Sequence, residues 1–321
     1  MNAAELDVRV ARKNTEAQDI CTFELVRADG QALPAFSAGS HIDVHLPNGV
    51  TRQYSLCNDP RESHRYLIGV LRDAASRGGS RAMHDDIVEG STLRISAPKN
   101  HFALAHGAAR SVLLAGGIGI TPILCMAERL ALTGAPFDLH YCTRSRERTA
   151  FAERIEAAAF AAQAHFHFDD GDAAQKLQLA QVVGTVQPGV HLYVCGPKGF
   201  MDAVLGAARA AGWPEDQLHY EFFSAEIVKS DADGEFEVKL ASSGRVIKVG
   251  KDQTVVQALA EAGVEVATSC EQGVCGTCLT RVLEGRPDHK DMYLTPEEQA
   301  ANDQFTPCCS RSCSPVLVLD L

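Results

Sequence analysis

Four cysteines near the C-terminus have types and spacing suited to redox chemistry. Cys270, Cys275 and Cys278 follow a C-x4-C-x2-C pattern, and Cys308 comes after 29 intervening residues. Thiolates in this spacing can hold a 2Fe–2S cluster, with four cysteines shared between two irons. The sequence therefore predicts a one-electron centre in the C-terminal part of the chain.

Other interpretations of these cysteines stay open. Gly273 and Gly276 would let the loop backbone approach a cluster closely. A structural zinc site favours two short C-x2-4-C arms, which fits one arm here but not Cys308 alone. Cys309 and Cys313 lie close to Cys308 and are rival fourth ligands. Buried, inert cysteines are the remaining alternative.

Segments around these cysteines resemble a known family. Residues 269–278, 288–291 and 317–321 are similar to the C-terminal ferredoxin domain of the phthalate dioxygenase reductase and vanillate demethylase reductase family. Members of this family are reductase components of Rieske-type oxygenases. The resemblance implies a plant-type 2Fe–2S ferredoxin domain with Cys308 as the fourth ligand, and two further motifs extend it over essentially the whole chain.

The strand Arg52-Gln53-Tyr54-Ser55-Leu56 resembles the R-x-Y-S-L strand that carries the flavin in the ferredoxin reductase superfamily. The resemblance implies that Tyr54 stacks on the isoalloxazine, Ser55 hydrogen-bonds near N5 and Arg52 neutralises the phosphate. Gln53 belongs to the same predicted site. The alternative is an ordinary barrel strand with an exposed arginine and a half-buried tyrosine.

A second segment, Gly78-Gly79-Ser80, opens a predicted helix. Glycines there expose free amides to an anion, and Ser80 could cap the helix and also donate to a ligand. A plain loop is the alternative. Together with the preceding strand, this segment would supply both ends of a site for a phosphorylated flavin. By the same resemblance the flavin is FMN, and the site is also lined by Val70 and Arg72.

A glycine-rich turn follows the predicted strand 112–115. Glycines between a buried strand and a helix let the backbone approach a pyrophosphate and use the helix dipole. The turn departs from G-x-G-x-x-G because Pro122 occupies the third glycine position, and no acidic residue clearly ends the next strand. A standard Rossmann dehydrogenase is therefore disfavoured. The residues proposed to bind the dinucleotide here are Gly116, Gly117, Gly119 and Thr121.

The G-G-x-G-I-T-P turn and the later Cys195-Gly196-Pro197 together match the nicotinamide domain of the ferredoxin reductase superfamily. The resemblance implies that Thr121 lies by the pyrophosphate and nicotinamide, and that Cys195 lies beside the nicotinamide ring. Hydride would then pass to flavin N5, with Ser55 and Cys195 as the catalytic pair. A core cysteine is the alternative for Cys195.

Two further segments complete the predicted dinucleotide site. Thr143 and Arg144 follow the second strand, where arginines could hold a 2′-phosphate, although the resemblance implies NADH. A solvated basic turn is the other interpretation. Residues 221–224 resemble the segment whose aromatic side chain covers the flavin face. Phe223 is the predicted cover, and either Phe222 or Phe223 could instead be a core residue.

The elements that must position these residues suggest a multidomain α/β plus β protein. Residues 1–104 show short alternating strands and hairpin turns, which predict an antiparallel flavin-binding β-barrel. Residues 105–225 alternate strands and helices, which predicts a parallel α/β nicotinamide domain. Residues 226–234 are acidic and small and are expected to be a linker. Residues 235–321 form the expected ferredoxin domain, for which the resemblance implies a β-grasp fold.

The composition of the chain limits the binding partners and the cellular location that can be expected. The chain has 321 residues, 45% of them hydrophobic, which indicates two or three domains and excludes a long disordered tract. Its formal charge of −11 argues against nucleic acid and anionic membranes as partners. No apolar signal core is present near the N-terminus, so a cytoplasmic protein is expected. The protein is also expected to be a monomer. Eleven cysteines in such a protein point to metal or redox use rather than disulfides.

Electron counting then gives the expected function. NADH delivers a hydride, an iron–sulfur cluster accepts one electron, and a flavin can do both. The sequence thus predicts a reductase that passes electrons from NADH through FMN and a 2Fe–2S cluster to a Rieske-type oxygenase. A reductase for another acceptor and a non-enzymatic ferredoxin-like carrier are the alternatives. Asp288 and Asp291 near the cluster are hypothesised to steer the docking of the oxygenase.

Overall fold

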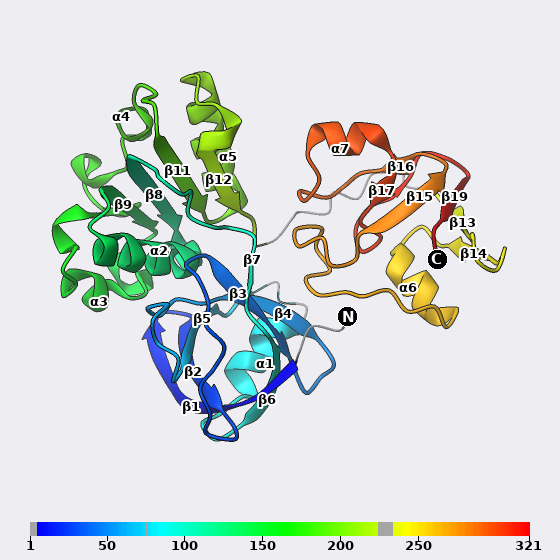
Figure 1. Cartoon of the computed structure of the whole chain (residues 1–321), viewed down its shortest axis with the longest axis horizontal. Helices are drawn as coiled ribbons and strands as arrows, with labels where there is room; N and C mark the ends of the chain where they lie inside the picture. The colour runs from blue at the N-terminus through cyan, green and yellow to red at the C-terminus, as the bar shows by residue number, and fades with distance from the viewer. Residues whose placement is uncertain (1–4, 75, 77, 224–233) are drawn as a thin grey trace. The chain divides into compact units, whose positions relative to one another are not determined.

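The computed structural model describes residues 5–74, 76, 78–223 and 234–321. The chain divides into two compact units, Met1–Phe223 and Ser224–Leu321 (Figure 1). The predicted border between residues 104 and 105 falls inside the first unit and stays a prediction. The predicted linker 226–234 lies outside the described residues, apart from Gly234.

The first part of the N-terminal unit is a seven-stranded antiparallel sheet in the order β4-β3-β6-β1-β2-β5, with β7 paired to β3. A bridge between Leu56 and Ile68 brings the two ends of this order together, as the predicted barrel requires. Apolar side chains of alternating strand positions, such as Val8, Val10 and Phe23, fill its core. The strands are β1 (Glu5–Ala17), β2 (Ile20–Arg27), β3 (Ser40–His45), β4 (Thr51–Ser55), β5 (Tyr66–Leu71), β6 (Thr92–Ser96) and β7 (Lys99–Asn100).

One short helix, α1 (Gly79–Asp85), lies between β5 and β6. The Lys13 ammonium donates hydrogen bonds to the carbonyl oxygens of His84 and Ile87 at 2.6 and 2.7 Å. Because the last carbonyls of a helix lack partners within the helix, a cation there stabilises its C-terminal end. Strand β1 thereby fixes α1 against the barrel.

The second part is a five-stranded parallel sheet in the order β10-β9-β8-β11-β12. The central strand β8 is apolar from Val112 to Ala115 because α2 covers one face of the sheet and α5 the other (Figure 1). The strands are β8 (Arg110–Gly116), β9 (Phe137–Thr143), β10 (Ala164–Phe168), β11 (Val190–Cys195) and β12 (Leu218–Glu221). The helices are α2 (Ile120–Thr133), α3 (Ala152–Glu156), α4 (Leu179–Val183) and α5 (Lys198–Ala210). Short 3-10 turns are η1 (Gly117–Gly119), η2 (Arg146–Arg148), η3 (Ala161–Gln163), η4 (Ala173–Gln175) and η5 (Glu215–Gln217).

The C-terminal unit is built on a mixed five-stranded sheet in the order β14-β13-β19-β15-β17, in which β13 and β19 are parallel. Helix α6 packs its apolar side chains on this sheet, and a capping box formed by Thr254 and Gln257 starts it. A second capping box, Thr295 with Glu298, starts α7. This arrangement confirms the predicted β-grasp fold. The elements are β13 (Phe236–Leu240), β14 (Val246–Val249), α6 (Val255–Glu261), β15 (Thr280–Glu284), β16 (Pro287–Asp288), α7 (Pro296–Ala301), β17 (Gln304–Phe305), β18 (Arg311–Ser312) and β19 (Val316–Leu319).

Within the described ranges, every helix is too short or too polar to cross a membrane.

Candidate redox sites

The two predicted flavin segments meet where β4 passes the first turn of α1. A Cβ atom on Gly79 would lie 2.6 Å from Cγ and 2.8 Å from Nε of Arg52. The preceding Gly78 has φ of 94°, a left-handed conformation that favours glycine. The Arg52 Nη1 atom donates to the Thr51 carbonyl at 2.7 Å. The Arg52 side chain and the N-terminal end of α1 therefore lie together, as a phosphate site requires.

The remaining predicted flavin residues contribute less directly. Ser80 does not cap α1, because Gly78 holds the N-cap position and the Ser80 hydroxyl accepts the Asp73 amide at 3.1 Å. The expectation that Ser80 caps the helix was therefore wrong. The Val70 side chain is buried in the barrel core, so only its backbone can face a ligand. Arg72 lies at the rim, where it pairs with Asp85 at 3.0 Å.

Gln53 and Tyr54 occupy opposite faces of β4. The Gln53 amide donates to Asp43 Oδ1 at 3.1 Å and lies 3.3 Å from the Nε2 atom of His41. Tyr54 packs against the barrel core, and burial raises the pKa of its hydroxyl above the ordinary range. The tyrosine therefore keeps its proton at neutral pH, and its ring is held in an apolar setting suited to stacking.

The glycine turn after β8 packs against the segment that follows β11. A Cβ atom on Gly119 would overlap the carbonyl oxygen of Cys195, and one on Gly196 would lie 2.9 Å from the Cα atom of Gly116. A Cβ on Gly116 would lie 2.9 Å from Cδ of Pro197. Strands β8 and β11 are neighbours, so both loops lie at the carboxyl edge of the sheet. Ligands of parallel α/β sheets bind at this edge.

The start of α2 also contacts the barrel. Gly117 has φ of 52° and leaves open space where a side chain would stand. The buried Thr121 donates its hydroxyl to the Ile118 carbonyl at 3.1 Å. Its methyl group would lie 3.0 Å from a Cβ on Gly69, in the middle of β5. Gly69 was not predicted, although a glycine inside a strand often marks such a close approach.

Ser55, Cys195 and Glu221 converge at the junction of the barrel and the parallel sheet. Ser55 Oγ donates to Glu221 Oε2 at 3.3 Å, and Cys195 and Glu221 are register partners on β11 and β12. Burial raises the pKa of Glu221 to about 7, which the Ser55 hydrogen bond partly opposes. Sequence reasoning missed Glu221, although it directly precedes the two phenylalanines.

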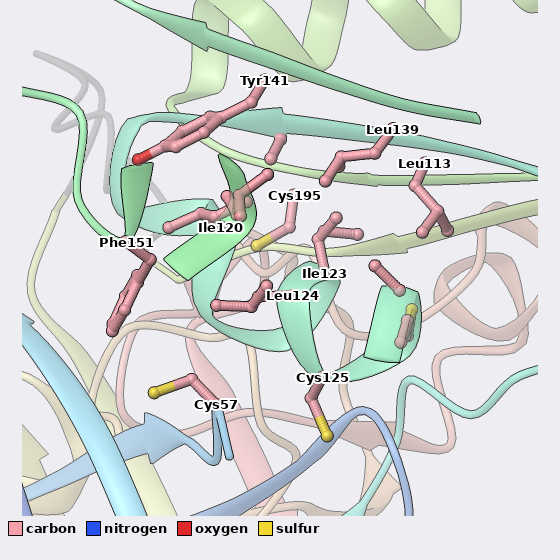
Figure 2. Packing of buried hydrophobic residues seen from close by; sticks show 14 of the residues in the cluster. Cys57, Leu113, Ile120, Ile123, Leu124, Cys125, Leu139, Tyr141, Phe151 and Cys195 are labelled. Atoms are coloured by element: carbon pink, nitrogen blue, oxygen red, sulfur yellow. The ribbon is translucent and has the colours of Figure 1, made fainter. Parts of the chain in front are cut away.

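Cys195 is fully buried in the core beneath this junction. Figure 2 shows its sulfur among the apolar side chains of Ile120, Ile123 and Leu124. Burial, together with the nearby Glu221 carboxylate, raises the pKa of the Cys195 thiol well above its ordinary value. Cys195 therefore stays a neutral thiol, which fits a group that packs beside a ligand ring rather than a nucleophile.

The end of β9 carries the predicted Thr143 and Arg144. The Thr143 hydroxyl is turned inward and donates to the Ser145 carbonyl at 3.1 Å, whereas Arg144 is exposed. Asp169 and Asp170 continue β10 at the same edge, since their amides donate to the carbonyls of Thr143 and Arg144. An acidic pair thus follows the third strand of the domain and not the second.

The two phenylalanines after Glu221 have different surroundings. Phe222 packs against the core that α5 covers and stacks edge-on with Tyr220. Phe223 is exposed and is the last described residue of the N-terminal unit. Of the two, Phe223 is the more exposed to solvent.

The four predicted cluster ligands form two thiol pairs. Cys270 lies within hydrogen-bond reach of Cys275, and Cys278 lies within reach of Cys308. In each pair, the shared hydrogen bond lowers one pKa and raises the other: it lowers those of Cys275 and Cys278 and raises those of Cys270 and Cys308. Because a 2Fe–2S cluster takes two protein ligands at each iron, two pairs fit it.

The backbone of the cysteine loop also fits the assignment of these thiols to a 2Fe–2S cluster. The amides of Gln272 and Thr277 donate to the sulfurs of Cys270 and Cys275 at 3.3 and 3.5 Å, and such bonds tune a cluster. Over the part of the chain that the structure describes, no three His, Cys, Asp or Glu side chains surround a point as they would a single metal ion.

Cys309 and Cys313 have other surroundings. The Cys309 sulfur lies within hydrogen-bond reach of Cys308, packs against Gly273, where a Cβ would overlap it, and lies 3.2 Å from Thr306 Oγ1. Cys313 is exposed beyond β18. Of these cysteines, Cys308 is the one within hydrogen-bond reach of Cys278, and Cys309 contacts Cys308 in turn.

Comparisons with known proteins cover nearly the whole chain. A family model for the 2Fe–2S iron-sulfur cluster binding domain matches residues 238–313, and one for the N-terminal domain of dimethylamine monooxygenase subunit DmmA-like proteins matches residues 94–218. The chain is 60% identical to vanillate O-demethylase oxidoreductase of Pseudomonas putida over 317 residues, 98% of this chain and 100% of that protein. It is 39% identical to phthalate dioxygenase reductase of Burkholderia cepacia, over 98% and 97% of the two chains.

A solved structure has the same architecture. Phthalate dioxygenase reductase, described as a modular structure for electron transfer from pyridine nucleotides to 2Fe–2S, superposes with a TM-score of 0.80 at 39% identity. The match covers 99% of this chain and 98% of the other.

Proposed function

The chain belongs to the family of flavin and 2Fe–2S reductases that serve Rieske-type oxygenases, and we propose that its partner is an oxygenase of the vanillate O-demethylase kind. As a member of this family, the protein is an NADH-dependent oxidoreductase that passes electrons through a flavin and a 2Fe–2S cluster. The choice of vanillate is supported by the 60% identity to a vanillate O-demethylase oxidoreductase, against 39% for a phthalate reductase.

The observation that carries the mechanism is the meeting of Ser55, Cys195 and Glu221. A bound flavin supplies the chemistry that accepts hydride and releases single electrons. The protein positions the flavin and the dinucleotide and excludes water from them. Strand β4 would present Ser55 from the barrel, and the turns after β8 and β11 would present a dinucleotide from the parallel sheet. The neutral Cys195 thiol adds no charge beside the reacting rings. Hydride transfer depends mainly on such positioning.

The flavin is proposed to be FMN. Its single phosphate would be held by the Arg52 guanidinium and the amides of Gly78 and Gly79, with Arg72 at the rim. Tyr54 would stack on the ring from the same strand. Extraction of the flavin followed by mass measurement tests this, because FAD in the extract would contradict a site closed by one phosphate.

The protein is further proposed to act as a monomer in the cytoplasm. A formal charge of −11 opposes self-association. The paired cluster thiols must stay reduced to bind iron, which a cytoplasm ensures. Light scattering of the purified holoprotein tests the monomer, since a dimer mass at micromolar concentration would contradict it.

The cluster assignment is tested with two serine variants. Cys308→Ser is expected to lose the electron paramagnetic resonance signal of the reduced cluster, while NADH still reduces ferricyanide at the flavin. Cys309→Ser, its matched control, is expected to retain both, because Cys278 pairs with Cys308, whereas the Cys309 sulfur contacts Cys308 and packs on Gly273. A cluster that survives in Cys308→Ser and is lost in Cys309→Ser would overturn the assignment.

The partner is tested by reconstitution. Wild-type reductase and the oxygenase component of a vanillate O-demethylase are expected to consume NADH and oxygen only when vanillate is present, with release of formaldehyde. Phthalate 4,5-dioxygenase, with its own substrate, is the matched comparison. Equal or faster turnover with the phthalate enzyme would overturn the proposed partner but leave the reductase activity standing.

A further inference from the structure

Three exposed apolar side chains are tied to the cysteine loop, residues 270–278. Leu279, Met292 and Tyr293 are 36%, 41% and 40% exposed. The Leu279 amide donates to the Gly276 carbonyl at 3.0 Å, and the Met292 amide donates to the Gly273 carbonyl at 2.9 Å. These hydrogen bonds hold the backbone at Leu279 and Met292 beside the loop.

Tyr293 is fixed by packing. Gly276 has φ of 67°, and a Cβ atom there would overlap the Tyr293 ring. The ring therefore lies directly on the peptide between Cys275 and Cys278. An ordered group of exposed apolar side chains is typical of a surface that another molecule covers.

The charges near this group differ from those predicted. Asp291 is buried and accepts hydrogen bonds from the Leu294 amide at 2.8 Å and from Ser310 Oγ at 3.3 Å, so the hypothesis that it steers docking is wrong. Asp288 lies 3.6 Å from the Lys290 ammonium, which offsets its charge.

Two exposed carboxylates lie close to the apolar group in the sequence. Glu271 stands inside the cysteine loop, and Glu297 stands in the first turn of α7, which begins shortly after Tyr293. We therefore expect the apolar centre to have an acidic border. Protein interfaces commonly have an apolar centre and a polar rim.

We propose that Leu279, Met292 and Tyr293 form the docking surface for the oxygenase component, which presents an apolar patch bordered by basic side chains. This inference rests on the proposed function, because electrons leave the protein from the cluster that the cysteine loop would enclose. An acceptor must therefore cover the surface of this loop. The acidic border favours a partner of opposite charge.

The proposal is tested with Met292→Ser and Tyr293→Ser, singly and together. The matched control is Val246→Ser, a 51% exposed apolar residue on β14, at the far edge of the sheet from β17. The double variant is expected to raise the Kd and KM for the oxygenase about tenfold, as loss of a central interface residue does. Val246→Ser is expected to change neither, and ferricyanide reduction and the resonance signal of the cluster should stay at wild-type levels.

The outcomes separate this proposal from the proposed function. If wild-type protein neither binds nor reduces the oxygenase, both fall. If wild-type protein does both and the variants match it, only the docking surface is overturned. Should Tyr293→Ser lose the cluster because its ring supports Gly276, Met292→Ser alone decides, since Met292 meets the loop through its backbone amide.

The charged border has a separate readout. Glu297→Gln is expected to lower kcat/KM for the oxygenase at low ionic strength and to match wild type at high salt, because salt screens exposed charges. An unchanged salt dependence would overturn the acidic border.

Discussion

Replacement of Glu221 by glutamine should stabilise the protein, and more so as the pH rises. The carboxyl group has an ordinary pKa of 4.5, and burial raises it to about 7 in the folded protein. At about 1.4 kcal/mol for each pKa unit, this shift corresponds to about 3 kcal/mol of destabilisation once Glu221 is charged. Glutamine keeps the shape of the side chain and can still accept the Ser55 hydrogen bond, but it carries no charge to desolvate.

The direction in which the free energy of unfolding changes with pH follows from proton binding. Between pH 4.5 and about 7 the folded protein holds a proton on Glu221 that the unfolded chain has released. The wild-type stability therefore falls as the pH rises through this window, and the full penalty is present above the folded pKa. The difference in free energy of unfolding between Glu221→Gln and wild type should grow by about 2 to 3 kcal/mol from about pH 5 to about pH 8.

Urea unfolding across this pH range, with saturating flavin, measures the difference. Glu215→Gln is the matched control, because Glu215 lies just before β12 but is exposed and paired with Arg209 at 2.7 Å, and its pKa is lowered. That control should show a small effect of opposite sign. A Glu221→Gln difference that stays constant with pH would refute the reasoning, since it would mean that Glu221 ionises as an ordinary carboxyl group.

Two glycine substitutions test the cofactor-binding turns. Gly119→Ala should destabilise the protein by about 1 to 3 kcal/mol and weaken NADH binding, because the new Cβ would overlap the backbone of Cys195. Its control is Gly206→Ala, which lies in open space on α5 and should be neutral or stabilising when both variants are unfolded in urea. Gly79→Ala should instead lower flavin affinity with little loss of stability, because only the flexible side chain of Arg52 must move. Flavin titration of the apoprotein measures this affinity. An unchanged affinity would contradict a phosphate site shared by Arg52 and the start of α1.

Elements with strong apolar patterns could be predicted from the sequence. The strand expected at 112–115 is the centre of β8. Burial on both faces makes β8 a continuous apolar run, which the sequence displays directly. By contrast, β1 is the longest strand of the barrel and lies in a charged segment. Because its solvent-facing residues are polar, the composition of the segment does not indicate a strand.

The site could be predicted only where neighbours in sequence act together. The cysteine loop and the glycine turn are local motifs whose chemistry depends on spacing. Glu221 acts on Ser55 across 166 positions, and this proximity depends on how the barrel packs on the parallel sheet. No local pattern encodes such packing. The same limit applies to Gly69, whose contact with Thr121 arises from β5 meeting α2.

The glycine turn after β8 and the cysteine loop are held by different contacts, and this difference determines how each loop tolerates a substitution. The glycine turn after β8 meets backbone atoms, since Gly119 abuts the Cys195 carbonyl and neighbouring strands fix both. The cysteine loop meets side chains instead: the Tyr293 ring covers Gly276. Trimming Tyr293 would make room for a side chain at Gly276, but the left-handed backbone there would still favour glycine by about 1 kcal/mol. The dinucleotide turn thus depends on rigid sheet geometry, whereas the cluster loop depends on the packing of an exposed side chain.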